Sequence, residues 1–242
     1  MKPFLKVALG IMISLAASSA IADTPEQVIK TKLSQLDDKR TIDRITETQM
    51  KEIYEVQFSD GKLVYSNADG SYMFNGDMVK IEGNKSTNLT KQARSKALAK
   101  LINAIPKEKM VVFSPKGETK AHITVFTDVD CGYCRKLHLE VPQLNKMGIE
   151  VRYLAFPRRG KKSQTYAMME NVWCAKDPKE AITLAKKGQE IAENKCDNPV
   201  EEQYKLGLRS GVRGTPSLVL ADGNLVPGYK SAEKLAELLG VK

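Results

Sequence analysis

The sequence predicts an α+β protein in which a helix joins two domains, and three observations support this fold class. Residues 41–82 hold short β-like runs separated by Asp-Gly and Asn-Gly pairs, which suit the tight turns of an antiparallel sheet. Apolar residues then recur at every fourth position over 88–106, the spacing of one helix face. Strand-like and helix-like runs alternate afterwards. We therefore expect a small antiparallel sheet domain over 23–87, a linker helix over 88–106 and an α/β domain over 107–242.

Residues 1–22 have the three-part pattern of a signal peptide. Two lysines supply a positive start, an apolar run spans Val7 to Ala17, and Ala20-Ile21-Ala22 places small residues where a signal peptidase reads them. The apolar run is shorter than the roughly 20 residues of a membrane-spanning helix, so we expect no stable membrane anchoring. Cleavage before Asp23 leaves all four cysteines in the exported chain, where disulfides are permitted.

The N-terminal domain begins with a predicted helix over about residues 25–36. Thr24 and Gln27 form a capping box at its start, with Pro25 at the first helical position. β-like runs follow at residues 54–58, 63–65, 72–74 and 78–81. A domain of only about 60 residues is marginal for an independent core, so its open sheet edges favour pairing with a second copy. A small sheet that packs only on its own helix is the alternative.

The polar residues 83–87 are interpreted as a linker that leads into the helix over 88–106, which Pro106 ends. This helix separates two different sequence patterns, so we interpret it as a connection between domains. A core helix of the second domain is the alternative.

The C-terminal domain is predicted to alternate between strands and helices. Strands are expected around residues 110–113, 123–127, 149–155, 217–220 and 225–226. A helix with a kink at Pro142 follows the second strand, residues 163–210 are largely helical by pattern, and an amphipathic helix ends the chain. This order of elements is that of a thioredoxin fold with a helical insertion.

The predicted reactive group is the pair of thiols in Cys131-Gly132-Tyr133-Cys134, which lies between a strand and a helix. A cysteine at a helix start faces unpaired backbone N–H groups and the positive end of the helix dipole, which favour its thiolate. Cys131 is therefore the expected nucleophile, and Cys134, one turn later, the resolving thiol. Another thiol of the substrate, or Cys134, would release the mixed disulfide. The first route rearranges disulfides and the second reduces them.

Other roles for the thiol pair fit less well. A zinc site needs a second close pair of ligands, but Cys174 and Cys196 lie far apart and no Cys-His cluster completes a site. Covalent haem needs a histidine directly after the second cysteine, where Arg135 stands. A disulfide between residues so close is strained and reducible, which again indicates redox chemistry. We therefore expect no metal and no cofactor.

Three further features of the C-terminal domain have predicted roles. Cys174 and Cys196 both lie in the helical insertion, and a structural disulfide is favoured over a second redox pair. In a thioredoxin fold the segment Gly214-Thr215-Pro216 lies opposite the thiol pair with Pro216 in the cis form, and the Thr215 backbone is then free to accept an extended substrate. His138 is interpreted as a surface or capping residue rather than a base.

The basic balance of the chain, a net charge of +9, does not predict nucleic-acid binding. Such binding needs basic and aromatic residues interleaved on one face, whereas the basic residues here are scattered, with short clusters such as 158–162. A solvated basic surface is the favoured interpretation.

Several blocks of the sequence resemble the DsbC family of bacterial periplasmic disulfide isomerases. The blocks run through the second domain and comprise residues 124–128, Cys131 to Cys134, 136–138, 151–158, 173–177, 214–216 and 225–229. The N-terminal domain matches in layout more than in sequence.

The resemblance implies a homodimer joined through the N-terminal domains, with both Cys131 residues facing an apolar cleft. It implies that Cys131 attacks and Cys134 resolves, that Gly132, Tyr133, Thr215 and Pro216 contact the substrate, and that Cys174 and Cys196 form the structural disulfide. The implied location is the periplasm. The implied partners are misoxidised exported proteins and a membrane thiol reductant of the DsbD type.

The resemblance favours an isomerase over a general reductase, because Val125 occupies the position where thioredoxins carry a buried carboxylate. The basic charge and a linker helix that looks long for the family are departures. The function expected is therefore isomerisation, and reduction, of incorrect disulfides. A monomeric oxidant or reductase and a peptide-holding chaperone with incidental thiols are the alternatives.

Overall fold

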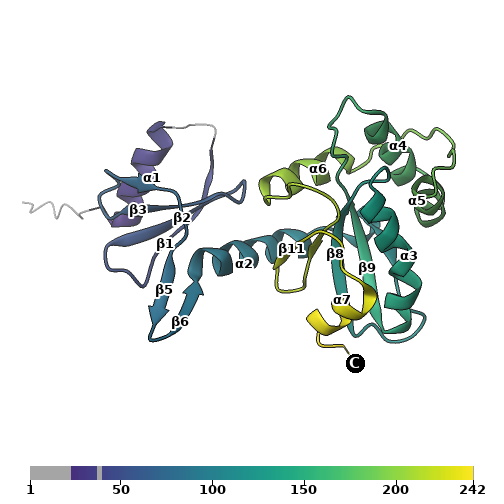
Figure 1. Cartoon of the computed structure of the whole chain (residues 1–242). Coiled ribbons are helices and arrows are strands. Elements are labelled where there is room, and N and C mark those ends of the chain that lie inside the picture. Colours follow the sequence, from purple (N-terminus) through teal and green to yellow (C-terminus); the bar gives the residue numbers. More distant parts are fainter. Residues whose placement is uncertain (1–22, 37–39, 242) are drawn as a thin grey trace, which may run out of the picture.

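A computed structural model describes residues 23–36 and 40–241, in a small N-terminal part and a larger C-terminal part connected by helix α2 (Figure 1). The predicted signal peptide, residues 1–22, lies outside the described residues. In the described part of the chain no helix is long and apolar enough to cross a membrane.

The N-terminal part is an antiparallel sheet covered by one helix. The helix is α1 (Pro25–Leu36), and the sheet has the order β1 (Ile42–Glu47), β2 (Ile53–Phe58), β3 (Leu63–Asn67) and β4 (Met73–Phe74). Ile29 and Leu33 of α1 are buried against Tyr54, Val56 and Phe58 of the sheet. Alternating apolar residues on β2 therefore form this small core.

A separate hairpin follows the sheet, formed by β5 (Val79–Glu82) and β6 (Lys85–Asn88). The prediction of a linker over 83–87 was wrong, because Lys85 to Asn88 pair with β5 as a strand. All of β5 and the first half of β6 are exposed, so polar residues are tolerated on both faces of the hairpin. The sequence of β6 therefore lacks the alternation of apolar and polar residues from which a strand is predicted.

Helix α2 (Leu89–Asn103) begins where the Asn88 side chain accepts a hydrogen bond from the Lys91 backbone N–H. Leu98 and Ile102 on its second half are buried in an apolar cluster of the C-terminal part. The helix is therefore both a connection between the parts and a component of the C-terminal core. A short 3₁₀ turn, η1 (Lys107–Lys109), follows it.

The C-terminal part is built on a five-stranded sheet in the order β11-β10-β8-β9-β7. The strands are β7 (Val111–Phe113), β8 (Ala121–Thr127), β9 (Ile149–Ala155), β10 (Ser217–Val219) and β11 (Leu225–Pro227). β8 and β9 are parallel, and the other neighbours are antiparallel.

Helices cover both faces of this sheet. Val125 and Tyr153 share a buried cluster with α3 (Gly132–Lys146), α4 (Gln164–Trp173), α5 (Pro178–Lys186) and α7 (Ala232–Leu238). Phe126 and Leu154, which point the other way, share a second cluster with α2 and α6 (Val200–Arg209). The predicted fold class, an antiparallel N-terminal sheet, a helix and a thioredoxin-like domain with a helical insertion, is confirmed.

The helical insertion is shorter than the sequence pattern predicts, because residues 187–199 form no helix. Gly188 has a φ of 76°, in the left-handed region that ends helices, and it follows α5 closely. A disulfide between Cys174 and Cys196 ties this irregular segment to the end of α4.

Candidate active site

The two thiols of the Cys-x-x-Cys segment lie at the junction of β8 and α3. Cys131 is the N-cap of α3, and the Cys134 backbone N–H donates to its sulfur at 3.4 Å. Both thiols are free, and both residues are buried, Cys131 with 3% of its surface exposed and Cys134 with none. Solvent exposure therefore does not distinguish the roles of the two thiols. Any difference in their reactivity must come from their electrostatic environments.

The two thiols have opposite pKa shifts. The hydrogen bond from the Cys134 thiol, assisted by the Cys134 backbone N–H and the positive charge of Arg158, lowers the pKa of Cys131 to about 5. Burial, and then the interaction with Cys131, raises the pKa of Cys134 far above that of an ordinary thiol. Cys131 is a thiolate at neutral pH and Cys134 stays protonated, which is the division of labour that disulfide exchange requires.

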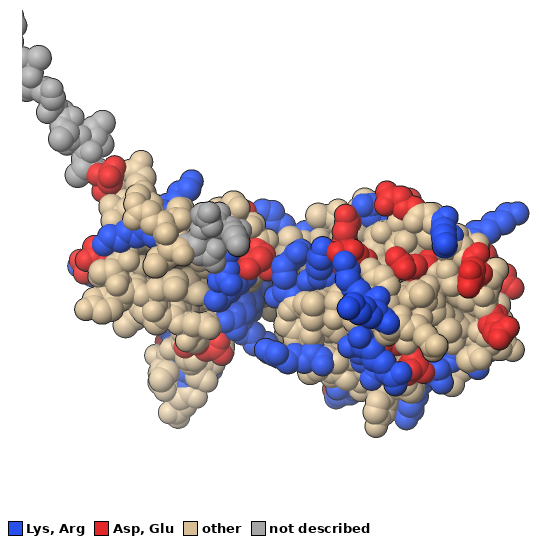
Figure 2. Space-filling view, turned by 90° about the horizontal axis from the view of Figure 1, so that it is seen from above, with Lys and Arg blue, Asp and Glu red and all other residues tan. Residues whose placement is uncertain are grey.

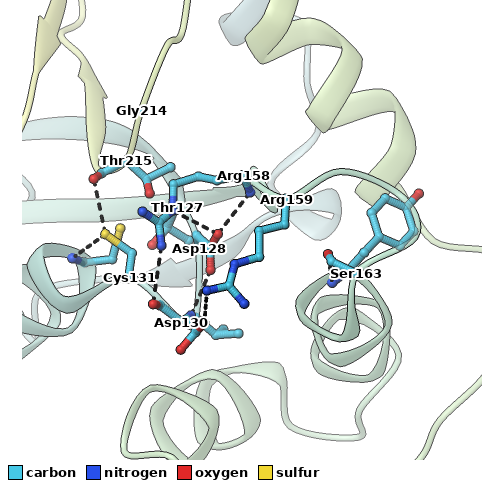
Figure 3. A network of polar contacts seen from close by, with 12 residues as sticks. Thr127, Asp128, Asp130, Cys131, Arg158, Arg159, Ser163, Gly214 and Thr215 are labelled. Carbon is cyan, nitrogen blue, oxygen red and sulfur yellow. Dashed lines mark hydrogen bonds and ion pairs between the residues drawn. The ribbon is translucent and has the colours of Figure 1, made fainter.

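The segment Gly214-Thr215-Pro216 lies directly opposite Cys131, and its Thr215–Pro216 peptide bond is cis. In the thiol form the Cys131 sulfur donates to the Thr215 carbonyl oxygen at 3.2 Å (Figure 3). The Thr215 hydroxyl is buried with no hydrogen-bond partner in the described part of the chain. A loop with a free hydroxyl thus borders the reactive sulfur.

A charged network supports the turn that carries Cys131 (Figure 3). The Asp128 carboxylate is almost completely buried, and it accepts hydrogen bonds from the Arg158 Nε at 3.1 Å and backbone N–H at 2.9 Å. Its other oxygen accepts from the Asp130 backbone N–H at 2.8 Å. The sequence predicts no role for Asp128 or Arg158 beyond their place in the segments that resemble the DsbC family. The two aspartates, Asp128 and Asp130, directly before Cys131 were the sequence feature that could have indicated a charged network at this turn.

An aromatic pair stands beside the reactive turn. Tyr133 is 64% exposed and stacks on Tyr229, with their ring centroids 6.4 Å apart. Glu140 holds the Tyr229 hydroxyl, and the Lys136 ammonium lies 4.5 Å from the Tyr229 ring centroid. Sequence reasoning assigned no role to Tyr229 or Glu140, because their proximity depends on the packing of the C-terminal segment against α3.

The interpretation of His138 as a surface or capping residue was wrong, because this histidine is buried beneath the site. Its Nδ1 lies 3.1 Å from the Tyr153 hydroxyl and its Nε2 3.0 Å from the Thr183 hydroxyl. Burial, assisted by Lys186 and Lys187, lowers the pKa of His138 to about 4, so the ring is neutral at physiological pH. Both ring nitrogens are occupied, and neither is free to serve a thiol.

The second cysteine pair is separate from the reactive one. Cys174 and Cys196 form a disulfide within the helical insertion, while Cys131 and Cys134 remain thiols. Over residues 23–36 and 40–241, no group of histidine, cysteine and carboxylate side chains is arranged to hold a metal ion.

Comparisons with known proteins agree with this geometry. A family model described as a thioredoxin-like domain matches residues 106–241, and one described as the N-terminal domain of disulfide bond isomerase proteins matches residues 18–91. The thiol:disulfide interchange protein DsbC of Escherichia coli (strain K12) is 37% identical over 226 residues, 93% of this chain and 92% of that protein. The DsbC of Haemophilus influenzae is 37% identical over 228 residues, 94% of this chain and 95% of that protein.

Similarity extends to solved structures. A disulfide interchange protein from Neisseria gonorrhoeae aligns with a TM-score of 0.50 and 29% identity, over 56% of this chain and 96% of that chain. The predicted resemblance and the predicted enzyme class are confirmed. The chain belongs to the DsbC family of thiol:disulfide interchange proteins.

Proposed function

We propose that this protein isomerises, and also reduces, incorrect disulfides in exported proteins through Cys131 and Cys134. The observation that carries the proposal is the opposite pKa shift of the two thiols at the start of α3. A nucleophile that is ionised at neutral pH attacks readily, and a protonated neighbour does not immediately reverse the attack.

In the first step the Cys131 thiolate attacks a substrate disulfide. A bond forms between Cys131 and one substrate sulfur, and the other substrate sulfur leaves as a thiolate. In isomerisation a substrate thiolate later attacks the mixed disulfide and restores the Cys131 thiolate, so no electrons are gained or lost overall. In reduction Cys134 attacks Cys131 instead, the pair becomes a disulfide, and the substrate gains two electrons.

The roles of the neighbouring residues follow from their positions. The backbone of Thr215 and Pro216, opposite Cys131, would align an extended substrate, and Gly132 and Tyr133 would contact it from the helix side. Reduction leaves the pair oxidised, so continued function needs a thiol reductant. We propose a membrane reductant of the DsbD type, a periplasmic location and signal cleavage before Asp23.

The proposed assembly is a homodimer formed through the N-terminal sheet. Its support is a group of exposed apolar side chains on β4, on the residue before it and on β5: Tyr72, Met73, Phe74, Val79 and Ile81. β4 is also an edge strand of its sheet, which leaves backbone groups available for pairing. Two copies joined here would carry two Cys131 sites.

Recovery of activity from a scrambled protein with several disulfides tests the function. The reduced wild-type protein should restore native pairing in catalytic amounts, and Cys131→Ser should lose this activity completely. Cys174→Ala/Cys196→Ala is the control, because it removes two sulfurs outside the reactive turn. Full activity of Cys131→Ser would exclude the proposal.

A further inference from the structure

Lys186, the last residue of α5, is a buried cation with no role in the scheme above. Only 4% of its surface is exposed, and no carboxylate forms an ion pair with it among residues 23–36 and 40–241. Burial of an unpaired ammonium opposes folding, and replacing such a group by an apolar one of similar volume is often neutral or stabilising. Its presence therefore needs an explanation other than stability.

The ammonium of Lys186 is hydrogen-bonded to the two residues that directly precede the turn of the thiol pair. Its Nζ donates to the Thr127 hydroxyl at 2.8 Å and lies 3.4 Å from the Asp128 carbonyl oxygen, at the end of β8 that leads into the Cys131 turn. The Tyr153 ring lies beneath it, with Nζ 5.3 Å from the ring centroid. Three neighbours thus hold the charge in one place without neutralising it.

Cys134 is the thiol that this charge affects most. Its environment is fully buried, and Lys186 is the foremost positive charge that favours its thiolate. The same attraction, which is strongest from Cys134, partly offsets the burial that lowers the pKa of Lys186 to about 8. At neutral pH the lysine is therefore mostly cationic.

We propose that Lys186 is a positioning residue that stabilises the Cys134 thiolate during its attack on the mixed disulfide, and thereby sets how fast the protein releases a bound substrate. The proposal rests on the proposed function, and it gives Lys186 control over the choice between rearrangement and reduction. A slow release favours rearrangement by substrate thiols, and a fast release favours reduction.

The step balances without a further reactant. Cys134 loses its proton to solvent, and its sulfur forms a bond with the Cys131 sulfur. The bond between Cys131 and the substrate sulfur breaks, and that substrate sulfur leaves as a thiolate that takes up a proton. The cysteine pair is oxidised by two electrons and the substrate is reduced by two.

Other charged groups around Lys186 do not replace it. Arg135 pairs with Asp130 on the surface, His138 is neutral, and the Asp128 carboxylate is bound to Arg158. Lys187 is exposed. The remaining titratable neighbours are the Tyr153 hydroxyl, whose pKa is raised by burial, and Cys131, which carries no charge in the mixed disulfide.

The test separates attack from release. Reduced protein is mixed with oxidised glutathione, the reaction is quenched with acid, and mass spectrometry follows the formation and decay of the mixed disulfide. In Lys186→Met, formation should stay within about twofold of wild type, since the low pKa of Cys131 leaves it ionised. Release at neutral pH should slow by about tenfold, the effect of a one-unit rise in the pKa of Cys134.

Three controls distinguish a charge effect from structural damage. Lys186→Arg should keep most of the release rate, and Lys187→Met, one residue away and exposed, should leave both steps unchanged. Lys186→Met should unfold at an equal or higher urea concentration than wild type, because it removes an unpaired buried charge. The deficit in release should shrink above about pH 9, where wild-type Lys186 itself loses its charge.

Release by Lys186→Met within about twofold of wild type would overturn the inference, and so would an equal slowing of attack and release. Either result leaves the proposed function intact, provided that Cys131→Ser is inactive. An active Cys131→Ser would instead overturn the proposed function first.

A second observation concerns what the protein binds beside Cys131. A pocket of about 280 Å³ lies between α6 and the loop before Thr215 and is lined by Phe156, Tyr204, Leu208, Arg158 and Arg213, among others. Two arginines and no acidic residue line it, and Arg213 has no ion-pair or hydrogen-bond partner in the described part of the chain. Lys and Arg side chains also gather on the part of the C-terminal domain nearest the N-terminal domain (Figure 2).

The geometry points to this pocket as a subsite for an acidic side chain of the substrate polypeptide, close to the cysteine that Cys131 attacks. Arg213 is adjacent to Gly214-Thr215, and the Thr215 carbonyl lies 3.2 Å from the Cys131 sulfur. Arg158 interacts electrostatically with the same sulfur. A segment bound along Thr215 therefore brings its neighbouring residues to the pocket, where a carboxylate pairs with Arg213. This proposal also rests on the proposed function.

Two peptides test the subsite, each with one cysteine in a disulfide with thionitrobenzoate and differing only in glutamate or lysine beside that cysteine. The acidic peptide should react about fivefold faster at low salt, and the difference should fall as salt rises. Arg213→Glu should abolish or reverse the preference. Lys146→Glu, an equal charge change at the far end of α3, should leave it unchanged. No preference, or an equal effect of both variants, would overturn this subsite.

Discussion

At the scale of residues, the reactivity of the site depends on a few hydrogen bonds rather than on exposure. Cys131 and Cys134 are both buried, and the bonds that converge on the Cys131 sulfur, together with the charge of Arg158, make it the stronger acid. The sequence was sufficient to predict this pair, because a strand, two close cysteines and a helix follow each other in the chain. It was insufficient for Lys186 and Tyr229, whose contacts join segments far apart in the sequence.

Replacing Arg158 tests the charged network. Arg158→Met leaves the buried Asp128 carboxylate without its cation, although two backbone N–H groups still donate to it. We expect a loss of about 2 kcal/mol in the free energy of unfolding, measured with urea. The pKa of Cys131 should rise, which the ultraviolet absorbance of the thiolate measures. An unchanged pKa would show that Arg158 acts on folding alone.

The low pKa of Cys131 also predicts how stability depends on pH. A thiol whose folded pKa lies below its unfolded pKa stabilises the protein above the unfolded value, and this contribution is lost as pH falls through the folded value. The reduced protein should therefore gain stability relative to the oxidised one between about pH 5 and the ordinary thiol pKa of about 9. Urea unfolding of both forms at several pH values measures the difference. Cys131→Ser cannot form the disulfide, so its stability is compared with that of the reduced wild-type protein, and it should lack the gain over this pH range.

At the scale of elements, the strands and helices with strong periodicity were predicted, and those without it were not. β8 and β9 are buried apolar runs, and α1 and α7 have regular apolar faces, so local pattern was enough. β6 is polar and mostly exposed, and residues 187–199 hold no helix although the pattern favoured one. The domain boundaries at 87/88 and 106/107 stay predictions, since α2 also belongs to the C-terminal core.

The packing of α2 against the C-terminal part gives a prediction at this scale. Gly223 lies in the turn between β10 and β11, and a Cβ there would lie only 1.8 Å from the Ser95 carbonyl oxygen of α2. Gly223→Ala should therefore displace α2 and lower the free energy of unfolding by well over the ~1 kcal/mol that a positive φ alone costs.

Gly211→Ala is the matched control for Gly223→Ala. Gly211 has the same φ of +81°, but nothing lies within 4 Å of the position its Cβ would take. Both variants share the backbone strain, and only Gly223→Ala adds the overlap. Equal free energies of unfolding of the two variants, measured with urea, would contradict this prediction. They would show that α2 can shift away from residue 223 without loss of stability.

At the scale of the whole molecule, the exposed apolar side chains of the N-terminal part predict the oligomeric state. Tyr72→Lys with Ile81→Lys should convert the proposed dimer into a monomer in sedimentation equilibrium, because charges would be buried in the interface. Leu139→Lys is the control, since Leu139 is equally exposed, at 76%, but lies on α3. A wild-type monomer, or a double variant that remains a dimer, would contradict this interface.

The spatial distribution of the basic residues is visible only at this scale. The basic residues look scattered along the sequence, and only the fold brings several of them together on the part of the C-terminal domain nearest the N-terminal domain (Figure 2). Ion pairs neutralise some of these basic residues. Arg158 pairs with Asp128 and Arg159 with Asp130. Lys161 and Lys205 both pair with Glu201. Sequence composition gave the sign of the charge but not its place.

The ultraviolet absorbance of the thiolate in the reduced protein, followed as a function of pH, tests the central claim most directly. The structure predicts that one thiolate appears with a midpoint at about pH 5, that Cys131→Ser abolishes it, and that Cys134→Ala shifts it upwards by removing its strongest hydrogen bond. A single midpoint near the ordinary thiol value, or two thiolates that ionise together, would contradict the division of roles between Cys131 and Cys134.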